Sequence, residues 1–286
     1  MEKIIKKYNF DFEHKNSGNP DQDFVFMCNS KTFIKSNGNY SKIISEIVKM
    51  NGNKVIDTNN IDKEIIFFTQ FYIPKDLDRK KEVVTCLKNN ISNPLINKIY
   101  LFGEEDYNFK EILGNIDIRK IKYINIGDRL SYKKTFETAD KLNNGKQIFI
   151  LANSDIYFDK TLKNLFNFNL KKHFLALTRI EEVNNGKNIY YKKDHISQDT
   201  WIWQDKLNID NRNTKKFKHY NKDGIKLGIH GCDNYIAYMM EDLGFIVKNK
   251  CKLINTFHLH KNQFREWQGK NKLNYNLEFK KKLKCE

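Results

Sequence analysis

Strand-like and helix-like segments alternate between residues 64 and 152, and this order restricts the fold more than any other feature of the sequence. Apolar runs at 65–72, 99–103, 122–126 and 148–152 have the length and the aliphatic and aromatic content of buried strands. Apolar residues at helical spacing occur at 78–90, after the first run, and at 132–142, before the fourth. Strands that alternate with helices are typical of right-handed βαβ units. We therefore predict an α/β fold with a mostly parallel central sheet and helices on both faces.

The apolar run 148–152 ends in a small polar cluster that carries two carboxylates. Asn153, Ser154 and Asp155 follow the run directly, and Asp159 comes four residues after Asp155. Open α/β sheets bind their ligands at the carboxyl ends of the strands, and hard divalent cations prefer carboxylate oxygens. The cluster is therefore the first candidate for an active centre. The same residue types also begin helices, so a turn that caps a helix starting near Lys160 is a second interpretation.

Length and composition indicate a soluble globular protein. The chain has 286 residues, 40% of them hydrophobic, which is enough for one large core or two smaller ones. No apolar run approaches the roughly 20 residues that cross a bilayer, and the first residues lack the apolar core of a signal peptide. We therefore expect a cytoplasmic location. The five cysteines contain no C-x-x-C pair, which predicts neither a disulfide framework nor a zinc site.

The formal net charge of +16 suggests nucleic acid or an anionic membrane as a partner. Only six of the 51 basic residues are Arg, and the many Lys residues accompany abundant Asn and Ile. Because Lys, Asn and Ile all have AT-rich codons, a compositional bias on a solvated surface explains the charge. We therefore expect no nucleic-acid partner, whereas a phosphate-bearing substrate and peripheral contact with a membrane are both compatible with the charge.

The pattern of segments divides the chain into three parts. Residues 1–62 form an N-terminal extension with a βαβ-like pattern, residues 63–265 form the principal domain, and residues 266–286 form a basic polar tail. In the extension we expect strands at 24–28 and 54–57 and a helix at 40–50. Later in the principal domain we expect strands at 174–179, 245–247 and 252–254 and a helix at 235–243.

Two more polar clusters follow apolar segments later in the chain. The segment 231–234, which contains Asp233, leads into a helix, and His258 and His260 follow a short strand. A carboxylate can hold or deprotonate a hydroxyl, and a hard cation tolerates an imidazole beside carboxylates. A simple helix cap is the other interpretation of Asp233. We expect one of the two histidines, with a slight preference for His260, to reach a cation, and the other to be a surface side chain.

The order of these motifs resembles that of the type-A glycosyltransferases, which use nucleotide sugars. The motifs are N-S-D-I-Y-F-D at 153–159, S-Q-D-T-W-I-W at 197–203, L-G-I-H-G-C-D-N-Y-I-A-Y at 227–238 and F-H-L-H at 257–260. The resemblance covers the region from 64 to 262. It implies a Rossmann-like sheet and metal-dependent transfer of a sugar from a nucleoside diphosphate sugar to the hydroxyl of a glycan or another acceptor. UDP is the expected nucleotide.

The same resemblance implies a metal site. Asp155 would be the acid of the D-x-D motif that binds Mn²⁺ or Mg²⁺, and His258 or His260 would be the late histidine on the metal. Asn153 stands at the first position of the motif, where the family has Asp. In this fold the last acid commonly makes the direct contact, so Asp155 remains the expected ligand.

Further roles follow for single residues. Asp233 would be the catalytic carboxylate at the sugar or the acceptor hydroxyl, although Asp-Asn stands where Glu-Asp is usual in the family. Thr69 and Asp128, after the first and third apolar runs, would lie near the base and ribose of the nucleotide. Arg179, at the end of a strand, is the candidate partner of the diphosphate, because Arg is scarce in this chain and binds phosphate with two parallel hydrogen bonds.

Two other classes of function are compatible with parts of the sequence. A nucleotidyltransferase would use a similar sheet and metal-binding acid, but residues 69–74 contain no Gly, unlike the glycine-rich phosphate loop usual in that class. A non-catalytic module that binds glycans or nucleic acid is consistent with Asn153 and with the basic surface. Trp201 and Trp203 either stack on a sugar or pack in the core.

Overall fold

The chain divides into two compact units, Met1–Asp62 and Lys63–Glu286. The computed structural model describes residues 17–36, 38–57, 63–183, 187–190, 197–210, 212–260 and 283–286. The predicted tail at 266–286 therefore lies mostly outside the described residues. Among the helices in the described ranges, none combines the length and the apolar composition of a transmembrane helix.

The first unit is a small βαβ element that is preceded in the sequence by a helix. Its elements are α2 (Pro20–Cys28), β1 (Thr32–Lys35), α3 (Asn39–Met50) and β2 (Lys54–Asp57). Strands β1 and β2 pair in parallel, and α3 provides the crossover between them. Cys28, Ile44 and Val48 are the buried apolar residues that hold these elements together.

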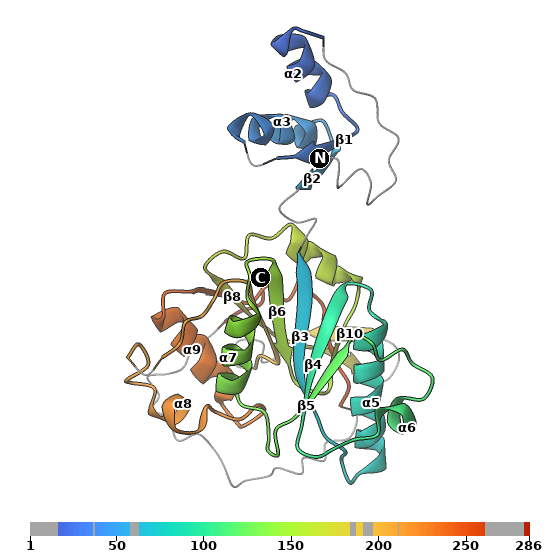
Figure 1. Ribbon diagram of the computed structural model, residues 1–286, viewed down its shortest axis with the longest axis vertical. Helices are drawn as coiled ribbons and strands as arrows, with labels where there is room; N and C mark the ends of the chain where they lie inside the picture. Colours follow the sequence, from blue (N-terminus) through green and yellow to red (C-terminus); the bar gives the residue numbers. More distant parts are fainter. Residues whose placement is uncertain are drawn as a thin grey trace. The chain divides into compact units, whose positions relative to one another are not determined.

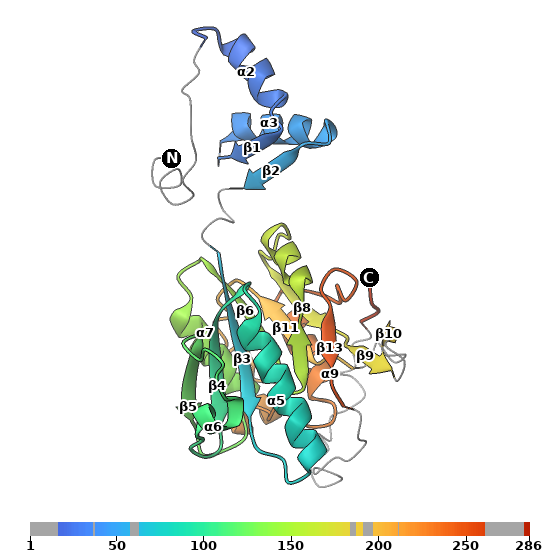
Figure 2. The same cartoon turned by 90° about the vertical axis from the view of Figure 1, so that its right-hand side faces the viewer.

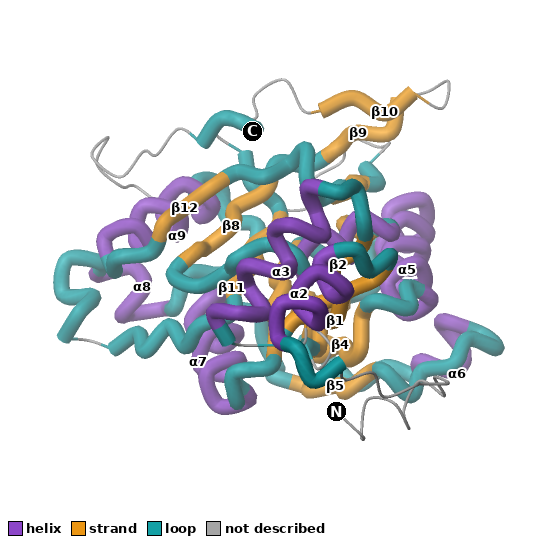
Figure 3. Tube along the Cα trace, turned by 90° about the horizontal axis from the view of Figure 1, so that it is seen from above, coloured by secondary structure: helices purple, strands orange, loops and turns teal. Residues whose placement is uncertain are grey.

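A seven-stranded sheet forms the centre of the described part of the second unit. Its strands in spatial order are β12 (Ile246–Lys248), β8 (His173–Leu177), β11 (Thr200–Trp203), β6 (Gln147–Ala152), β3 (Glu64–Phe71), β4 (Ile96–Gly103) and β5 (Ile121–Asn125). Neighbouring strands pair in parallel, except that β11 is antiparallel to both β6 and β8. Figure 3 shows β12, β8 and β11 side by side in this sheet. The mostly parallel sheet predicted from the sequence is confirmed.

Helices cover both faces of this sheet (Figure 1). α5 (Leu77–Ser92) and α6 (Phe109–Leu113) lie on one side, and α7 (Tyr132–Leu142), α8 (Lys218–Asp223) and α9 (Cys232–Asp242) lie on the other. Alternate residues of β3 point to the two sides: Ile66 and Phe68 belong to the core with α7 and α9, whereas Phe67 belongs to the core with α5. Because both faces are buried, the apolar runs in the sequence are continuous.

Strands β9, β10 and β13 gather in a second sheet (Figure 2). This sheet has the order β10 (Lys187–Tyr190), β9 (Ile180–Val183), β13 (Thr256–His258) and β7 (Ile156–Phe158), and η1 (Lys160–Phe166) follows β7. β7 begins directly after the polar turn that ends β6, and β13 pairs with it antiparallel, with His258 opposite Ile156. This pairing brings the end of β13 to the polar cluster after β6.

Two predicted strands are wrong. Residues 24–28 belong to α2, because the Asn19 side chain accepts hydrogen bonds from the amides of its first turn and Pro20 suits the first helical position. Residues 252–254 form a turn, in which the Leu253 amide donates to the Lys250 carbonyl at 2.9 Å. Strand β11 is identified only by the structure, because Trp201–Trp203 is a short run between polar loops.

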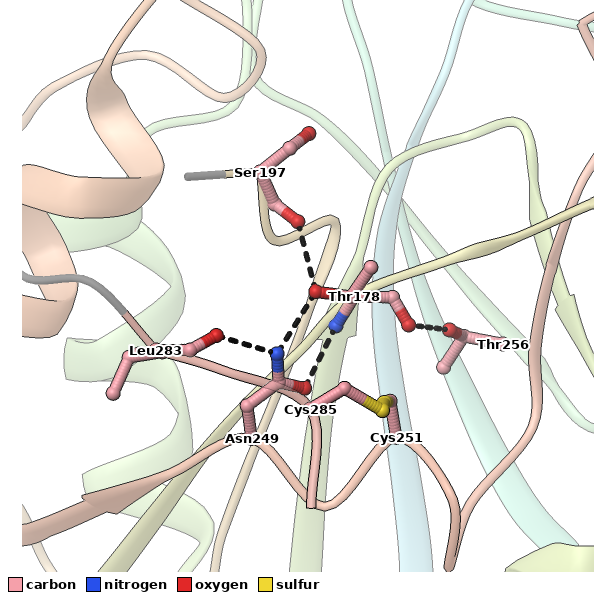
Figure 4. Close-up of a disulfide and its surroundings, with 7 residues drawn as sticks. All are labelled: Thr178, Ser197, Asn249, Cys251, Thr256, Leu283 and Cys285. Carbon is pink, nitrogen blue, oxygen red and sulfur yellow. Dashed lines mark hydrogen bonds between the residues drawn. A yellow bond between two sulfur atoms is a disulfide. The ribbon is translucent and has the colours of Figure 1, made fainter. Parts of the chain in front are cut away.

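A single disulfide joins Cys251 to Cys285, although the sequence predicts no disulfide framework. Asn249 supports this region, since its side chain donates to Thr178 Oγ1 at 2.8 Å and to the Leu283 carbonyl at 2.9 Å (Figure 4). It also accepts a hydrogen bond of 3.1 Å from the Thr178 amide. The cysteines have no local spacing motif, and their pairing depends on the return of the last residues to the end of β8.

Loss of this disulfide should destabilise the protein. The bond joins residues 34 positions apart, and a crosslink of that span restricts the unfolded chain by about 2–4 kcal/mol. We expect the double variant Cys251→Ser, Cys285→Ser to lose about that much free energy of unfolding in a denaturant titration. Reduction of the unchanged protein should give the same loss. An unchanged stability in both tests would show that the two cysteines do not pair in solution.

Candidate metal centre and active site

The candidate site lies at the carboxyl ends of β3 and β6, where the order of strands changes direction. From β3 the sheet continues through β4 and β5 on one side, and the chain then returns to β6 on the other. Ligands of open α/β sheets bind at such a switch point. Thr69 Oγ1 donates a hydrogen bond of 2.9 Å to the Ala152 carbonyl and so ties the two strand ends together. The polar cluster at 153–155 begins directly beyond this contact.

Asp155 is buried, with 7% of its surface exposed, and side chains from two other segments meet at its Oδ2 atom. Arg79 Nη2 pairs with Oδ2, His258 Nε2 lies 3.1 Å from it, and His260 Nδ1 lies 3.7 Å from it. The other oxygen, Oδ1, is buried and has no hydrogen-bond partner within the described ranges. Because a buried carboxylate oxygen without a partner is costly, Oδ1 marks a position where a bound cation would compensate.

Asp155, His258 and His260 form a candidate metal centre. Each offers one ligand atom, and these atoms all lie within 4.8 Å of one another. One carboxylate and two imidazoles suit Mn²⁺ better than Mg²⁺, which prefers oxygen ligands. Glu181 Oε2 lies 2.9 Å from His258 Nδ1 and orients the ring so that Nε2 faces Asp155, an arrangement common behind metal-bound histidines. The residues therefore fit a divalent cation.

Both histidines lie beside Asp155, although we predict only one of them near a cation. Residues two positions apart in an extended chain point to the same side, and His258 and His260 have this spacing. The Leu259 amide donates to the Asp155 carbonyl at 3.0 Å, and its own carbonyl accepts from Arg79 Nη1 at 3.0 Å. The two imidazole rings lie 5.4 Å apart, measured between their centroids.

Neighbouring charges shift the pKa values of the buried groups. Burial raises the pKa of Asp155, but His258 and Arg79 outweigh it and hold that pKa well below its usual range. Burial lowers the pKa of His258, but Asp155 and Glu181 outweigh it, so this pKa rises to about 9. Burial also raises the pKa of Glu181, which hydrogen bonds with His258 and Arg179 nevertheless lower to about 2. Protonation of His258 would therefore compete with the binding of a cation to its ring.

Asp199 connects the metal centre to Asp233. Asn153 Nδ2 donates to Asp199 Oδ1 at 2.7 Å, and Arg179 Nη1 donates to Asp199 Oδ2 at 2.6 Å. The amide of the preceding residue, Gln198, donates to Asp233 Oδ2 at 3.2 Å. The Asp199 carboxylate also contributes to raising the pKa values of both His258 and Asp233. Gln198 and Asp199 thus contact Asp233 and the polar cluster after β6, respectively.

Asp233 lies in the first turn of α9, but Gly231 is the N-cap residue of that helix. Its carboxylate accepts a hydrogen bond from the backbone of another segment, at Gln198. Burial, and after it the Asp199 carboxylate, raises the pKa of Asp233 to about 7. A carboxylate with that pKa can accept a proton from a hydroxyl at neutral pH more readily than an ordinary one.

The residues predicted to contact the nucleotide are not part of the metal cluster. Thr69 is buried, and its hydroxyl donates a hydrogen bond to the Ala152 carbonyl. Asp128 is exposed beyond the end of β5 and forms an ion pair with Lys226. Arg179 is 8% exposed, and its Nε donates to Glu181 Oε1 at 2.6 Å. Its contacts with Glu181 and Asp199 favour a role in orienting those carboxylates over the predicted role at a diphosphate.

Trp201 and Trp203 are fully buried, so the interpretation that they stack on a sugar is wrong. Trp201 packs against the ring of Tyr132, and Trp203 packs against the ring of Phe136. Both tryptophans thus belong to the core under α7. Asp159 caps η1, because its Oδ1 accepts a hydrogen bond of 2.8 Å from the Thr161 amide.

Three residues of the site have no predicted role from the sequence. Arg79 contacts Asp155, Glu181 contacts His258, and Asp199 contacts Asn153. The scarcity of Arg is a signal that could single out Arg79, which stands at the start of the helix after the first strong strand. Asp199 lies within the S-Q-D-T-W-I-W motif, and Glu181 follows Arg179 by two positions, but no local pattern distinguishes either from a surface acid.

No family model and no curated protein matches the sequence. Solved structures with a similar fold include a mannosyltransferase from Pyrobaculum calidifontis in complex with GDP-Man and Mn²⁺. Its sequence identity is 7% and its TM-score is 0.43, and the match covers 70% of this chain and 58% of the mannosyltransferase. S. aureus TarS 1-349 in complex with UDP-GlcNAc matches with 12% identity and a TM-score of 0.38 over 70% of this chain and 56% of that one. A 4-diphosphocytidyl-2C-methyl-D-erythritol synthase matches with 10% identity and a TM-score of 0.37 over 65% of this chain and 89% of that one.

A mannosyltransferase is therefore among the solved structures to which this chain is similar. This chain spans less than two thirds of the length of the mannosyltransferase and of TarS. Each of these three TM-scores lies below 0.5, so any assignment of activity depends on the side chains of the site.

Proposed function

We propose that this protein is a cytoplasmic, metal-dependent glycosyltransferase that moves a sugar from a nucleoside diphosphate sugar to the hydroxyl of a glycan or another acceptor. UDP is the expected nucleotide. The observation that carries the proposal is the buried cluster of Asp155, His258 and His260 at the switch point of a mostly parallel sheet. Open α/β sheets bind nucleotides at that point, and a diphosphate that leaves a sugar needs positive charge beside it.

The side chains of the centre would have separate roles in metal binding and in proton transfer. Asp155, His258 and His260 would hold a divalent cation, which when bound supplies positive charge to the leaving diphosphate. Glu181 keeps the His258 ring oriented. Asp233 would accept the proton of the acceptor hydroxyl or, alternatively, hold a hydroxyl of the donor sugar.

Other residues would orient this machinery or contact the nucleotide. Asn153 and Arg179 fix the Asp199 carboxylate, which in turn contributes to the raised pKa of Asp233. The predicted contacts of Thr69 and Asp128 with the base and ribose remain predictions. Asp128 is the more accessible of the two, because the Thr69 side chain is buried.

Calorimetry of UDP binding tests the proposed metal dependence. We expect UDP to give binding heat in the presence of Mn²⁺ and none after the metal is removed with a chelator, because the diphosphate would have no cation to contact. Equal binding heat with and without the metal would contradict metal-dependent binding. Binding of a glycan without any binding of UDP would favour the non-catalytic module.

Single substitutions of the two histidines test whether both hold the cation. We expect His258→Ala and His260→Ala each to weaken Mn²⁺ affinity by at least about tenfold, because both rings face Asp155. Titration of Mn²⁺ followed by electron paramagnetic resonance measures this affinity. His219→Ala, which changes an exposed histidine, is the matched control and should bind Mn²⁺ normally. A histidine whose removal leaves Mn²⁺ affinity unchanged is not a ligand.

A further inference from the structure

Arg79 is a buried cation that contacts three segments of the chain. It lies in the first turn of α5 and is 8% exposed. Its Nη2 pairs with Asp155 Oδ2, while Nη1 donates to the Leu259 carbonyl at 3.0 Å and to Glu82 Oε2 at 2.9 Å. Asp155 follows β6, and Leu259 lies between the two histidines after β13. One guanidinium therefore links both segments that carry the candidate metal ligands.

We infer that Arg79 is a positioning residue that holds these two segments at the spacing a divalent cation needs, an inference that rests on the metal site of the proposed function. The guanidinium is planar, and its donors have a fixed geometry. With Nη2 on the Asp155 carboxylate and Nη1 on the Leu259 carbonyl, it sets the position of the carboxylate relative to the segment that carries His258 and His260. A site that is held in place before its ligand arrives binds that ligand more tightly.

The contacts of Arg79 argue against a role as a competitor of the cation. Arg79 occupies only Oδ2 of Asp155, and Oδ1 is the buried oxygen that has no partner within the described residues. Glu82, on the same helix as Arg79, and the Leu259 carbonyl hold its Nη1. The guanidinium is thus anchored independently of Asp155, so it can stay in place when a cation binds to the carboxylate.

Hydrogen–deuterium exchange on the metal-free protein tests the positioning role without any activity measurement. The Leu259 amide donates to the Asp155 carbonyl, so its exchange rate reports whether the two segments stay together. Lysine keeps the charge but cannot bridge two acceptors in the same way. We expect Arg79→Lys to speed exchange at 256–260 by about tenfold or more through local opening, while exchange in β12 stays unchanged.

Manganese affinity provides the second measurement. We expect Arg79→Lys and Arg79→Met to weaken the binding of Mn²⁺, measured without nucleotide, by about 10–100-fold. Substitution of a residue that orients metal ligands typically has an effect of this size. If Arg79→Met does not fold, Glu82→Gln should give a smaller loss in the same direction, because it weakens the anchor of Nη1. Arg119→Lys is the matched control, since Arg119 is an exposed arginine paired with Asp117, and it should change neither exchange at 256–260 nor Mn²⁺ affinity.

The outcomes separate this inference from the proposed function. Unchanged exchange and unchanged Mn²⁺ affinity in the Arg79 variants would overturn the positioning role, even if Asp155→Asn abolishes Mn²⁺ binding. Tighter Mn²⁺ binding in those variants would also overturn it, because Arg79 would then compete with the metal. Faster exchange at 256–260 with weaker Mn²⁺ binding supports it. Faster exchange in a protein that binds no Mn²⁺ at all would contradict the metal site and with it both proposals.

Discussion

The substitution Asp155→Asn should abolish manganese-dependent binding of UDP and lower turnover by roughly 10²–10³-fold or more. Asp155 supplies the carboxylate of the candidate metal centre, and asparagine keeps its size while it removes the charge. The cation would then have two imidazoles and no anionic ligand, so it could no longer hold the diphosphate. Calorimetry of UDP with Mn²⁺ and the rate of UDP release from a nucleotide sugar measure the two losses.

Asp159→Ala is the control for this substitution, because Asp159 is the other acid of the same motif. It caps η1, and its second oxygen accepts a hydrogen bond from Asn255 Nδ2. Its removal should cost about 0.5–2 kcal/mol of stability and leave UDP binding unchanged. Asp155→Asn breaks a buried ion pair with Arg79, a change worth about 3–5 kcal/mol, so binding has to be measured well below its unfolding temperature. Undiminished metal-dependent UDP affinity in Asp155→Asn would remove Asp155 from the metal site.

Asp233→Asn should lower turnover by roughly 10²–10⁴-fold and leave the affinities for Mn²⁺ and UDP nearly unchanged. A carboxylate that takes the acceptor proton acts only in the chemical step, and asparagine keeps the shape of the side chain. Steady-state kinetics with donor titrations separate turnover from binding. If Asp233 instead holds hydroxyls of the donor sugar, the variant should bind the intact nucleotide sugar more weakly but free UDP normally. Wild-type turnover would show that Asp233 has no part in the reaction.

The raised pKa of Asp233 gives this residue a signature in the pH dependence of turnover. Only the ionised carboxylate can accept a proton, and its pKa is about 7. Turnover should therefore fall about tenfold for each pH unit below 7 and level off above it. The Asp233→Asn variant should lose this dependence. A wild-type profile that is flat between pH 5 and 7 would show that Asp233 is not the base.

The central strands could be predicted because their signal is local. β6 is buried along its whole length, so its residues form one continuous apolar run, and the polar cluster with Asp155 follows it directly. β11 could not be predicted in the same way, because its four residues are an island whose partners, β6 and β8, come from distant parts of the chain. The same holds for β13, whose partners β7 and β9 lie far from it in the sequence.

The candidate site could be predicted only as three separate clusters. Asp155, Asp233 and the two histidines stand out because each follows an apolar segment. The residues that connect them give no such signal, since their contacts are far apart in sequence. Arg79 meets Asp155 across 76 positions and Leu259 across 180. The disulfide between Cys251 and Cys285 depends equally on the folded path of the chain.

Release of a nucleoside diphosphate from nucleotide sugars tests the proposed function most directly. Many transferases of this kind slowly pass their sugar to water, so no acceptor has to be known. A set of UDP and GDP sugars, incubated with Mn²⁺, should give diphosphate release with at least one member, and the release should stop with a chelator and in Asp155→Asn. Release of pyrophosphate from a nucleoside triphosphate, without any release of diphosphate from the sugars, would contradict the proposal and favour a nucleotidyltransferase.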